Sequence, residues 1–180
     1  MADLGHRYAV ASPWRKWYNE TVKKKVYIET SVVSYYASRP SRDIVIAARQ
    51  EITRERWKRI LVEFDCHVSV LVVQEAEGGN SQAVSARVEA IAGLPVLQID
   101  KAAEELAKSL IDDGPIPEEK AEDALHIALA ARAGMDYLLT WNFTHIHNAQ
   151  MELSIRRIVE RHGYECPVFC SIEELIGDEE

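Results

Sequence analysis

Short apolar runs alternate along the chain with longer segments in which apolar residues recur at helical spacing. The strand-like runs cover residues 26–29, 68–73, 95–99, 135–140 and 167–169. Spacing of three and four residues predicts helices at 31–37, 44–64, 81–92, 101–111, 117–133 and 145–162. Strands separated by helices are typical of a parallel sheet that is covered on both faces. We therefore expect an α/β fold, a three-layer α/β/α sandwich around a central, mostly parallel sheet.

The helix expected at 117–133 has the clearest end signals. Pro117 suits its first position, Glu118 and Glu119 favour its positive end, and Gly134 ends it. Thr30 or Ser31 is expected to cap the helix at 31–37. In the helix expected at 44–64, one apolar stripe would consist of Ile44, Ala48, Ile52, Trp57, Ile60 and Leu61.

Length and composition favour one ordinary globular domain. The chain has 180 residues, of which 47% are hydrophobic, and it contains 3 cysteines, too few and too scattered for a disulfide framework or a zinc site. No apolar run approaches the ~20 residues that span a bilayer, and residues 1–25 lack the apolar stretch of a secretory signal. We expect a cytoplasmic protein with no membrane partner, built as an N-terminal extension at 1–23 and one domain at 24–178.

Charge is distributed unevenly along the chain. The net charge is -8, yet residues 1–59 contain 13 Lys and Arg against 6 Asp and Glu, while residues 60–180 contain 8 against 23. A basic face beside an acidic cleft would hold a polyanion while a cation occupies the acid cluster. Ordinary solvated helix faces explain the same distribution equally well.

Two acids follow predicted strands. Glu29 comes directly after the buried run at 26–28, and Glu75 follows the run at 68–73. The carboxyl ends of parallel strands form a crevice where ligands collect, so both acids are candidates for a site there. Either acid could instead serve the next helix, Glu29 as a cap and Glu75 as a first-turn residue, and Glu77 competes with Glu75 for any role.

A third acid lies inside a helix. Asp123 shares a face with Ile127 and Ala130, and a carboxylate beside an apolar face is costly unless it is paired or metal-bound. This cost favours a functional role for Asp123. Thr140 and Asn142 end the strand at 135–140 and are expected near it. The histidines are expected to be packed or surface residues: His126 in the core, and His145 and His147 near the start of the last long helix.

Oxygen ligands that converge on one crevice suit a hard cation such as Mg2+ or Mn2+. A divalent ion neutralises charge on a phosphodiester and lowers the pKa of a bound water. The leading hypothesis from these residues is therefore a metal-dependent phosphodiesterase.

Four short motifs in this order resemble the PIN-domain ribonucleases, especially the VapC-like toxins of toxin–antitoxin pairs. The resemblance covers about residues 25–175. Its motifs are Glu29-Thr30-Ser31 after the first strand, Glu75 after the second, Asp123-Ala124-Leu125-His126-Ile127-Ala128, and Thr140-Trp141-Asn142-Phe143.

The resemblance implies a PIN-like sandwich, Mg2+ or Mn2+ as cofactor, and endonucleolytic cleavage of RNA by the toxin component of a type II toxin–antitoxin system. It also implies a homodimer and a cognate antitoxin. The implied catalytic and metal residues are Glu29, Glu75, Asp123 and Asn142, with Thr30 and Thr140 orienting them. Glu29 and Asn142 depart from the aspartates usual in the family, which predicts weak metal binding.

Arg39 and Arg42 are the main candidates for binding the RNA phosphates, and Arg49 or Arg54 is a secondary candidate. The alternative hypothesis is a catalytically silent PIN-like module that binds RNA or a protein, which the departures at Glu29 and Asn142 favour. A nucleotide-binding domain is a weaker alternative, because no glycine-rich loop follows the first strand.

Overall fold

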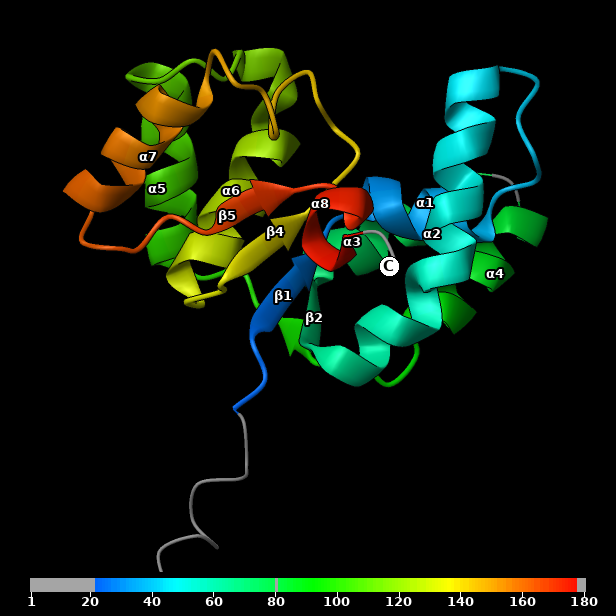
Figure 1. Ribbon diagram of the computed structural model, residues 1–180. Helices are drawn as coiled ribbons and strands as arrows, with labels where there is room; N and C mark the ends of the chain where they lie inside the picture. The colour runs from blue at the N-terminus through cyan, green and yellow to red at the C-terminus, as the bar shows by residue number, and fades with distance from the viewer. Residues whose placement is uncertain (1–21, 80, 178–180) are drawn as a thin grey trace, which may run out of the picture.

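The computed structural model describes residues 22–79 and 81–177 (Figure 1). A single five-stranded sheet runs through it in the order β3-β2-β1-β4-β5, and every neighbouring pair is parallel. Its strands are β1 (Lys25–Ile28), β2 (Asp65–Ser69), β3 (Val96–Leu97), β4 (Tyr137–Leu139) and β5 (Val168–Cys170). The predicted α/β class with a parallel sheet is confirmed.

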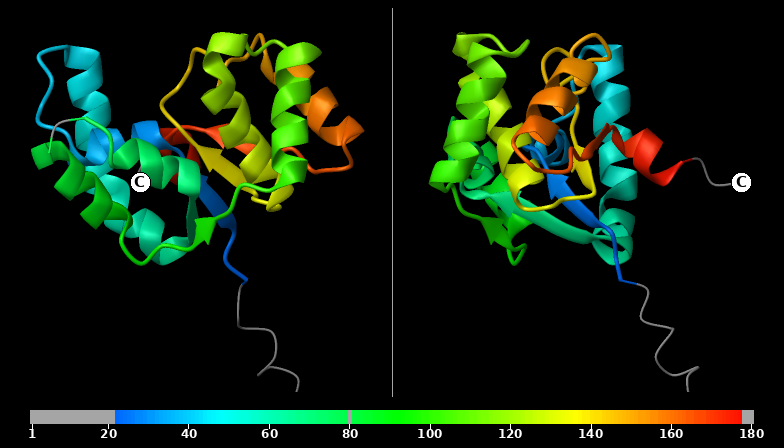
Figure 2. Two further views of the ribbon diagram at one scale, coloured as in Figure 1. Left: turned by 180° about the vertical axis from the view of Figure 1, so that it is seen from behind. Right: turned by 90° about the vertical axis from the view of Figure 1, so that its left-hand side faces the viewer.

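Helices lie on both sides of this sheet, with α2 on one side and α5 on the other (Figure 2). Helix α5 packs against α6 and α7, while α1 packs against α2 and α4. The helices are α1 (Thr30–Ala37), α2 (Ile44–Glu63), α3 (Val70–Ala76), α4 (Ser81–Ile91), α5 (Lys101–Asp112), α6 (Ala121–Arg132), α7 (Glu152–Arg161) and α8 (Ile172–Ile176), with a 3-10 turn, η2 (Glu118–Lys120), before α6.

The central strand β1 is buried except for its first residue, Lys25. Val26, Tyr27 and Ile28 expose none of their surface, and on the neighbouring strand Leu138 and Leu139 are equally buried. Such continuous burial follows from covering both faces of a parallel sheet, so that residues on either side of the strand meet a helix layer. The strands are therefore rigid supports for whatever follows them.

The chain changes direction within the sheet between β1 and β4. It moves outward from β1 through β2 to β3, then returns across the sheet to place β4 on the other side of β1. The register pairs Ile28 with Leu139, so the residues after both strands emerge next to each other. A crevice for ligands forms where the strand order reverses in this way.

The second strand differs from its prediction. It ends at Ser69, and Val70–Ala76 forms helix α3 instead of continuing the strand. The Ser69 hydroxyl accepts a hydrogen bond from the backbone of Val72, which caps the helix, and this local bond outweighs the strand preference of the valines. As a result, Glu75 lies in the second turn of α3 and not at a strand end.

Three predictions about the helices were also wrong in detail. The last long helix starts at Glu152 and not at His145, because 143–151 forms a series of turns. In α2 the predicted stripe fails at its beginning, where Ile44 is 83% exposed. The cap of α1 is neither Thr30 nor Ser31 but the side chain of Glu29.

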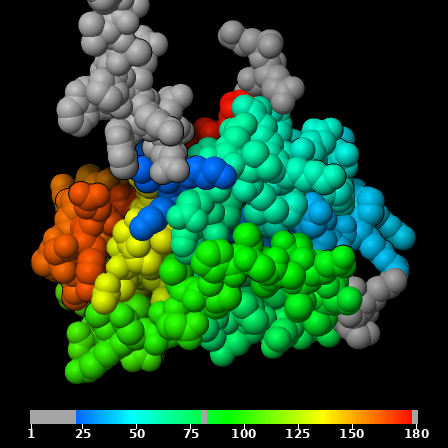
Figure 3. Space-filling model, turned by 90° about the horizontal axis from the view of Figure 1, so that it is seen from below, coloured from blue at the N-terminus to red at the C-terminus, as the bar shows by residue number. Residues whose placement is uncertain are grey.

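The amino end of the sheet is closed by charged residues. The Lys24 ammonium lies 2.6 Å from the carboxylate of Asp136, and the Lys24 carbonyl accepts from the backbone of Asp65. Figure 3 looks at this end and shows the first described residues, in blue, between the teal segment before β2 and the yellow segment near β4. The predicted extension at 1–23 lies outside the described residues except for its last two.

Within the described residues, no helix is long and apolar enough to cross a membrane.

Candidate functional site

Glu29 lies at the carboxyl end of β1 and is 5% exposed. Its Oε1 accepts the backbone N–H of Ser31 at 3.0 Å, which caps α1, and its Oε2 accepts the hydroxyl hydrogens of Ser31 and, at 2.7 Å, Thr140. The capping role and the position at the sheet edge therefore belong to the same side chain. Three donors compensate the cost of burying this carboxylate.

Glu75 reaches the same region from α3. Its Oε2 accepts from the Thr30 hydroxyl and from Nε2 of His126 at 3.1 Å. Because an ionised carboxylate can only accept, Nε2 of His126 holds the proton in this contact. The same imidazole nitrogen lies 4.0 Å from Oε1 of Glu29, so His126 stands between the two acids.

A buried hydrogen-bonded relay supports His126 from beneath. Its Nδ1 lies 2.7 Å from the Tyr27 hydroxyl, which lies 2.7 Å from the hydroxyl of Ser69. Nε2 of His126 donates to Glu75, and the hydroxyls of Tyr27 and Ser69 continue this hydrogen-bonded chain from Nδ1 into the core. Burial raises the pKa of Tyr27 far above its usual range, which keeps this hydroxyl protonated.

The pKa of Glu75 is lowered from its ordinary value. Burial alone would raise it, but the hydrogen bond and the charge of His126, together with the hydroxyl of Thr30, outweigh that effect. Glu75 is therefore an ionised carboxylate at neutral pH. The hydrogen bond from His126 holds the Glu75 carboxylate in place at the edge of the sheet.

Asp123 comes from the first turn of α6, and its side chain is only 16% exposed. Its Oδ1 accepts from Nδ2 of Asn142 at 3.0 Å, and its Oδ2 lies 3.0 Å from Nδ1 of His145. The neighbouring Glu122 is exposed to solvent, and Glu119 lies exposed in η2.

Thr140 connects the two groups of acids. Its hydroxyl donates to Glu29 and accepts the backbone N–H of Asn142 at 2.9 Å, while the Asn142 amide donates to Asp123. A continuous hydrogen-bonded network therefore runs from Asp123 through Asn142 and Thr140 to Glu29. His126 then links Glu29 with Glu75.

Sequence reasoning overlooked three members of this arrangement. His126 was expected to be packed, and it is 1% exposed, but its contact with Glu75 had no local signal. His145 was expected to be a surface or capping residue, yet it lies against Asp123. Tyr27 looked like any apolar residue of a buried strand. The acid in an otherwise apolar stretch was the only available indication of where these partners gather.

The predicted phosphate-binding arginines come from the loop after α1 and from α2. Arg39 and Arg42 are exposed in the loop between α1 and α2, and their role stays a prediction. Arg54 pairs with Glu51 at 3.0 Å and donates to the carbonyl of Ser38. Arg49 differs, because its guanidinium lies over aromatic rings next to the acid network.

The donors of the network have the oxygen chemistry that Mg2+ prefers, but their placement does not fit a ready-made cation site. Among residues 22–79 and 81–177, no group of three or more His, Cys, Asp or Glu side chains could hold a metal ion. Glu29 accepts protein hydrogen bonds on both oxygens, while Asp123 accepts one on Oδ1 and has Nδ1 of His145 3.0 Å from Oδ2. Asn142 presents its nitrogen to Asp123, while its oxygen accepts the backbone N–H of Thr144 and His145.

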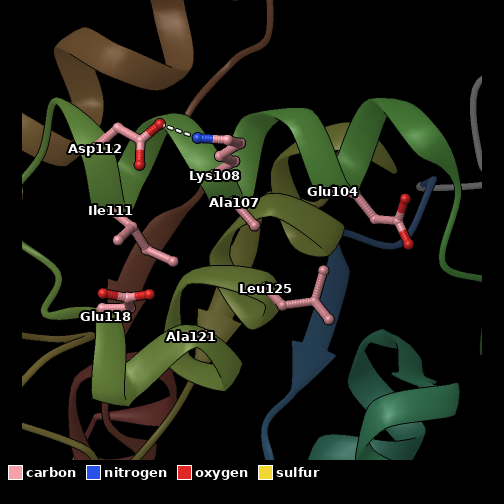
Figure 4. Close-up of a pocket in the computed structure, with 8 residues that line it drawn as sticks. All are labelled: Glu104, Ala107, Lys108, Ile111, Asp112, Glu118, Ala121 and Leu125. Atoms are coloured by element: carbon pink, nitrogen blue, oxygen red, sulfur yellow. Dashed lines mark hydrogen bonds and ion pairs between the residues drawn. The ribbon is translucent and has the colours of Figure 1, made fainter.

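Two of the surface hollows lie among the helices on opposite sides of the sheet. One, of about 470 Å³, lies between α5 and the start of α6, with Lys108 bound to Asp112 above an apolar floor (Figure 4). Its rim also contains Glu104 and Glu118, so its negative charge disfavours a polyanion. The other, of about 370 Å³, is lined by Arg49, Glu173 and apolar residues of α2.

No protein-family model matches the chain, and no curated protein sequence matches it. One solved structure that aligns with it is VapC20 of Mycobacterium tuberculosis, described as a toxin that cleaves the sarcin-ricin loop. The alignment covers 66% of this chain and 91% of that chain, with 16% identity and a TM-score of 0.49. A likeness at this level establishes neither the family nor the activity of the present chain.

Proposed function

We propose that the protein is an endoribonuclease with its active site at the carboxyl edge of β1 and β4. The observation that carries the proposal is the hydrogen-bonded network joining Glu29, Asp123 and Asn142, together with Glu75, whose partner His126 lies 4.0 Å from Glu29. These four residues come from separate parts of the chain, and three of them are acids held in partly or fully buried positions. Acids kept at such a cost, at a switch point of a parallel sheet, support a site that acts on a ligand.

The chain's own groups offer acid–base chemistry at this edge. Asp123 and His145 form a carboxylate–imidazole pair, and both side chains are partly accessible, at 16% and 18% exposure. An imidazole within reach of a bound RNA can pass a proton to or from it, which is what cleavage of an RNA phosphodiester requires of its general acid or base. Glu75, Thr30 and His126 would keep the inner side of the site in a fixed geometry.

Mg2+ or Mn2+ belongs to this proposal as the cofactor. A bound divalent ion would neutralise charge on the phosphodiester and activate water. This part rests on the resemblance of the four motifs, because the acids as placed do not fit such an ion. The toxin role, a cognate antitoxin and a homodimer rest on the same resemblance.

A second candidate function is favoured by the engagement of the acids with protein donors. A network in which Asn142 and Ser31 satisfy the carboxylates is also what a catalytically silent RNA- or protein-binding module would have. The two candidates differ in one measurable property. The nuclease cleaves RNA, whereas the silent module binds a partner without cleaving it.

The experiment that separates them uses purified full-length protein and 5′-labelled RNAs of varied structure, with added Mn2+, Mg2+ or EDTA. Internal cuts that depend on Asp123 support the nuclease. Titration calorimetry with Mn2+ on the same preparation then tests the cofactor. Intact RNA, together with no heat of Mn2+ binding at millimolar concentration, would favour the silent module.

A further inference from the structure

Arg49 is held on an aromatic surface beside the acid network. Its guanidinium carbon lies 4.7 Å from the ring centre of Phe143 and 5.5 Å from that of Trp141. Phe143 directly follows Asn142, whose amide donates to Asp123. We call Arg49, Trp141 and Phe143 the aromatic shelf. It adjoins the proposed active site along the chain, because Phe143 is the residue after Asn142.

Arg49 differs from several other arginines of the protein in how its charge is compensated. Arg54, Arg132 and Arg161 each form an ion pair with a carboxylate. Within the described part of the chain, no carboxylate lies within ion-pair distance of Arg49, which contacts rings instead. A guanidinium in this setting retains its hydrogen-bond donors for an anionic ligand.

The aromatic shelf is buried at Trp141 and exposed at Phe143. Trp141 is 4% exposed, and its indole N–H donates to the hydroxyl of Thr53 at 3.0 Å, which fixes the ring. Phe143 packs edge-on against Trp141 at 6.1 Å and is 37% exposed. The hollow of about 370 Å³ lies on the α2 side of Arg49. A fixed ring beside an exposed ring and an adjoining hollow is the arrangement of a ligand-binding surface.

We propose that the aromatic shelf binds an unpaired nucleotide of the RNA, with Arg49 contacting a phosphate and Phe143 contacting a base. The proposal rests on the proposed ribonuclease function and names the class of its substrate, single-stranded RNA. Unpaired bases stack on aromatic rings and on guanidinium groups, whereas the bases of a duplex are already stacked on each other.

A peptide ligand explains the shelf less well. The exposed apolar residues Ile44 and Val45 at the hollow would suit a protein partner, but they do not account for an unpaired guanidinium on an aromatic pair. Phosphate and base together use both features of the shelf. Because Phe143 directly follows Asn142, a nucleotide on the shelf would lie beside the acid network.

The test is fluorescence anisotropy with a labelled single-stranded RNA of mixed sequence and a duplex of the same sequence, both in EDTA so that cleavage does not interfere. The full-length protein is compared with Phe143→Leu, which keeps an apolar side chain without a ring, and with Arg49→Lys, which keeps the charge without the planar group. Arg161→Lys, in an exposed ion pair with Asp113, is the matched control. Thermal unfolding of each variant checks that it is folded.

We expect the single strand to bind more tightly than the duplex, and each shelf variant to weaken single-strand binding about 5- to 50-fold while Arg161→Lys does not. Equal binding of both RNAs, or unchanged binding by Phe143→Leu and Arg49→Lys, overturns the proposal. Binding of neither RNA also overturns it and would favour a protein partner for the hollow. Shelf-dependent binding without any cleavage would retain the shelf and refute only the nuclease.

Discussion

The side-chain amide of Asn142 turns its nitrogen, and not its oxygen, toward Asp123, with Nδ2 donating to Oδ1 at 3.0 Å. This orientation is fixed, because the Asn142 oxygen accepts from the backbone of Thr144 and His145. The amide therefore compensates the charge of Asp123.

Replacing this amide by a carboxylate tests whether the charges at the site suit a divalent cation. Asn142→Asp would set two like charges against each other and is expected to cost about 1–3 kcal/mol of stability in EDTA. If a divalent ion belongs to the site, the same variant should bind Mn2+ more tightly than wild type and recover stability when Mn2+ is added. Calorimetry and thermal unfolding give the two readouts.

Asn148→Asp is the matched control, because Asn148 also accepts a turn N–H, from Gln150, but lies outside the acid network. It should change neither Mn2+ affinity nor stability by a comparable amount. An Asn142→Asp protein that is as stable as wild type in EDTA would contradict the like-charge argument.

The relay beneath His126 should be visible in stability. Tyr27→Phe removes the hydroxyl that lies between Ser69 and His126 and leaves both polar groups buried with one partner fewer. We expect a loss of about 1–3 kcal/mol in chemical denaturation. Tyr35→Phe, on a partly buried tyrosine stacked on Trp141, is the control and should lie close to wild type. Equal effects of the two variants would remove the relay from the account.

Acid titration should report the ion pair of Glu75. Its pKa is lowered in the folded protein, so its contribution to stability is present above the ordinary carboxyl pKa and is lost as the pH falls through the lowered value. Wild type should therefore be more stable than Glu75→Gln near neutrality, and the difference should shrink between about pH 5 and pH 3. Glu77→Gln, at the exposed end of the same helix, should show no such trend. A difference that stays constant over this range would refute the assignment.

Much of the fold could be predicted because burial is periodic along the chain. The alternation of apolar runs and helical spacing predicted the parallel sheet, and the burial of residues 26–28 in β1 follows directly from their run of mostly apolar side chains. The end of β2 could not be predicted, since valines favour strands and only the cap formed by Ser69 makes 70–76 helical. Local preference was overruled there by a single hydrogen bond and by packing.

The site was predictable only where an acid interrupts an apolar context. Glu29 and Asp123 were recognised for that reason. Their partners were not, because a histidine in a helix has no local signal of what it faces. His126 contacts Glu75 across 51 positions of sequence. His145 meets Asp123 through the turns of 143–151, which were expected to be helical.

The support beneath the aromatic shelf depends on one buried hydrogen bond. Thr53→Val keeps the shape of the side chain but leaves the indole N–H of Trp141 without its acceptor. The expected cost is about 1–3 kcal/mol, read from the thermal midpoint. Thr144→Val, at an exposed position, should have little effect. If Thr53→Val is no less stable than Thr144→Val, Trp141 is not fixed in this way.

The most direct measurement of the central claim is cleavage of labelled RNA by wild type, Asp123→Asn and Glu122→Gln, each with Mn2+, Mg2+ or EDTA. Glu122 is the neighbouring acid on α6, exposed and outside the network. The account predicts internal cuts by wild type and by Glu122→Gln, and a large loss of cleavage in Asp123→Asn. Cleavage that is equal in all three proteins, or absent from wild type on every RNA, would contradict an endoribonuclease at this site.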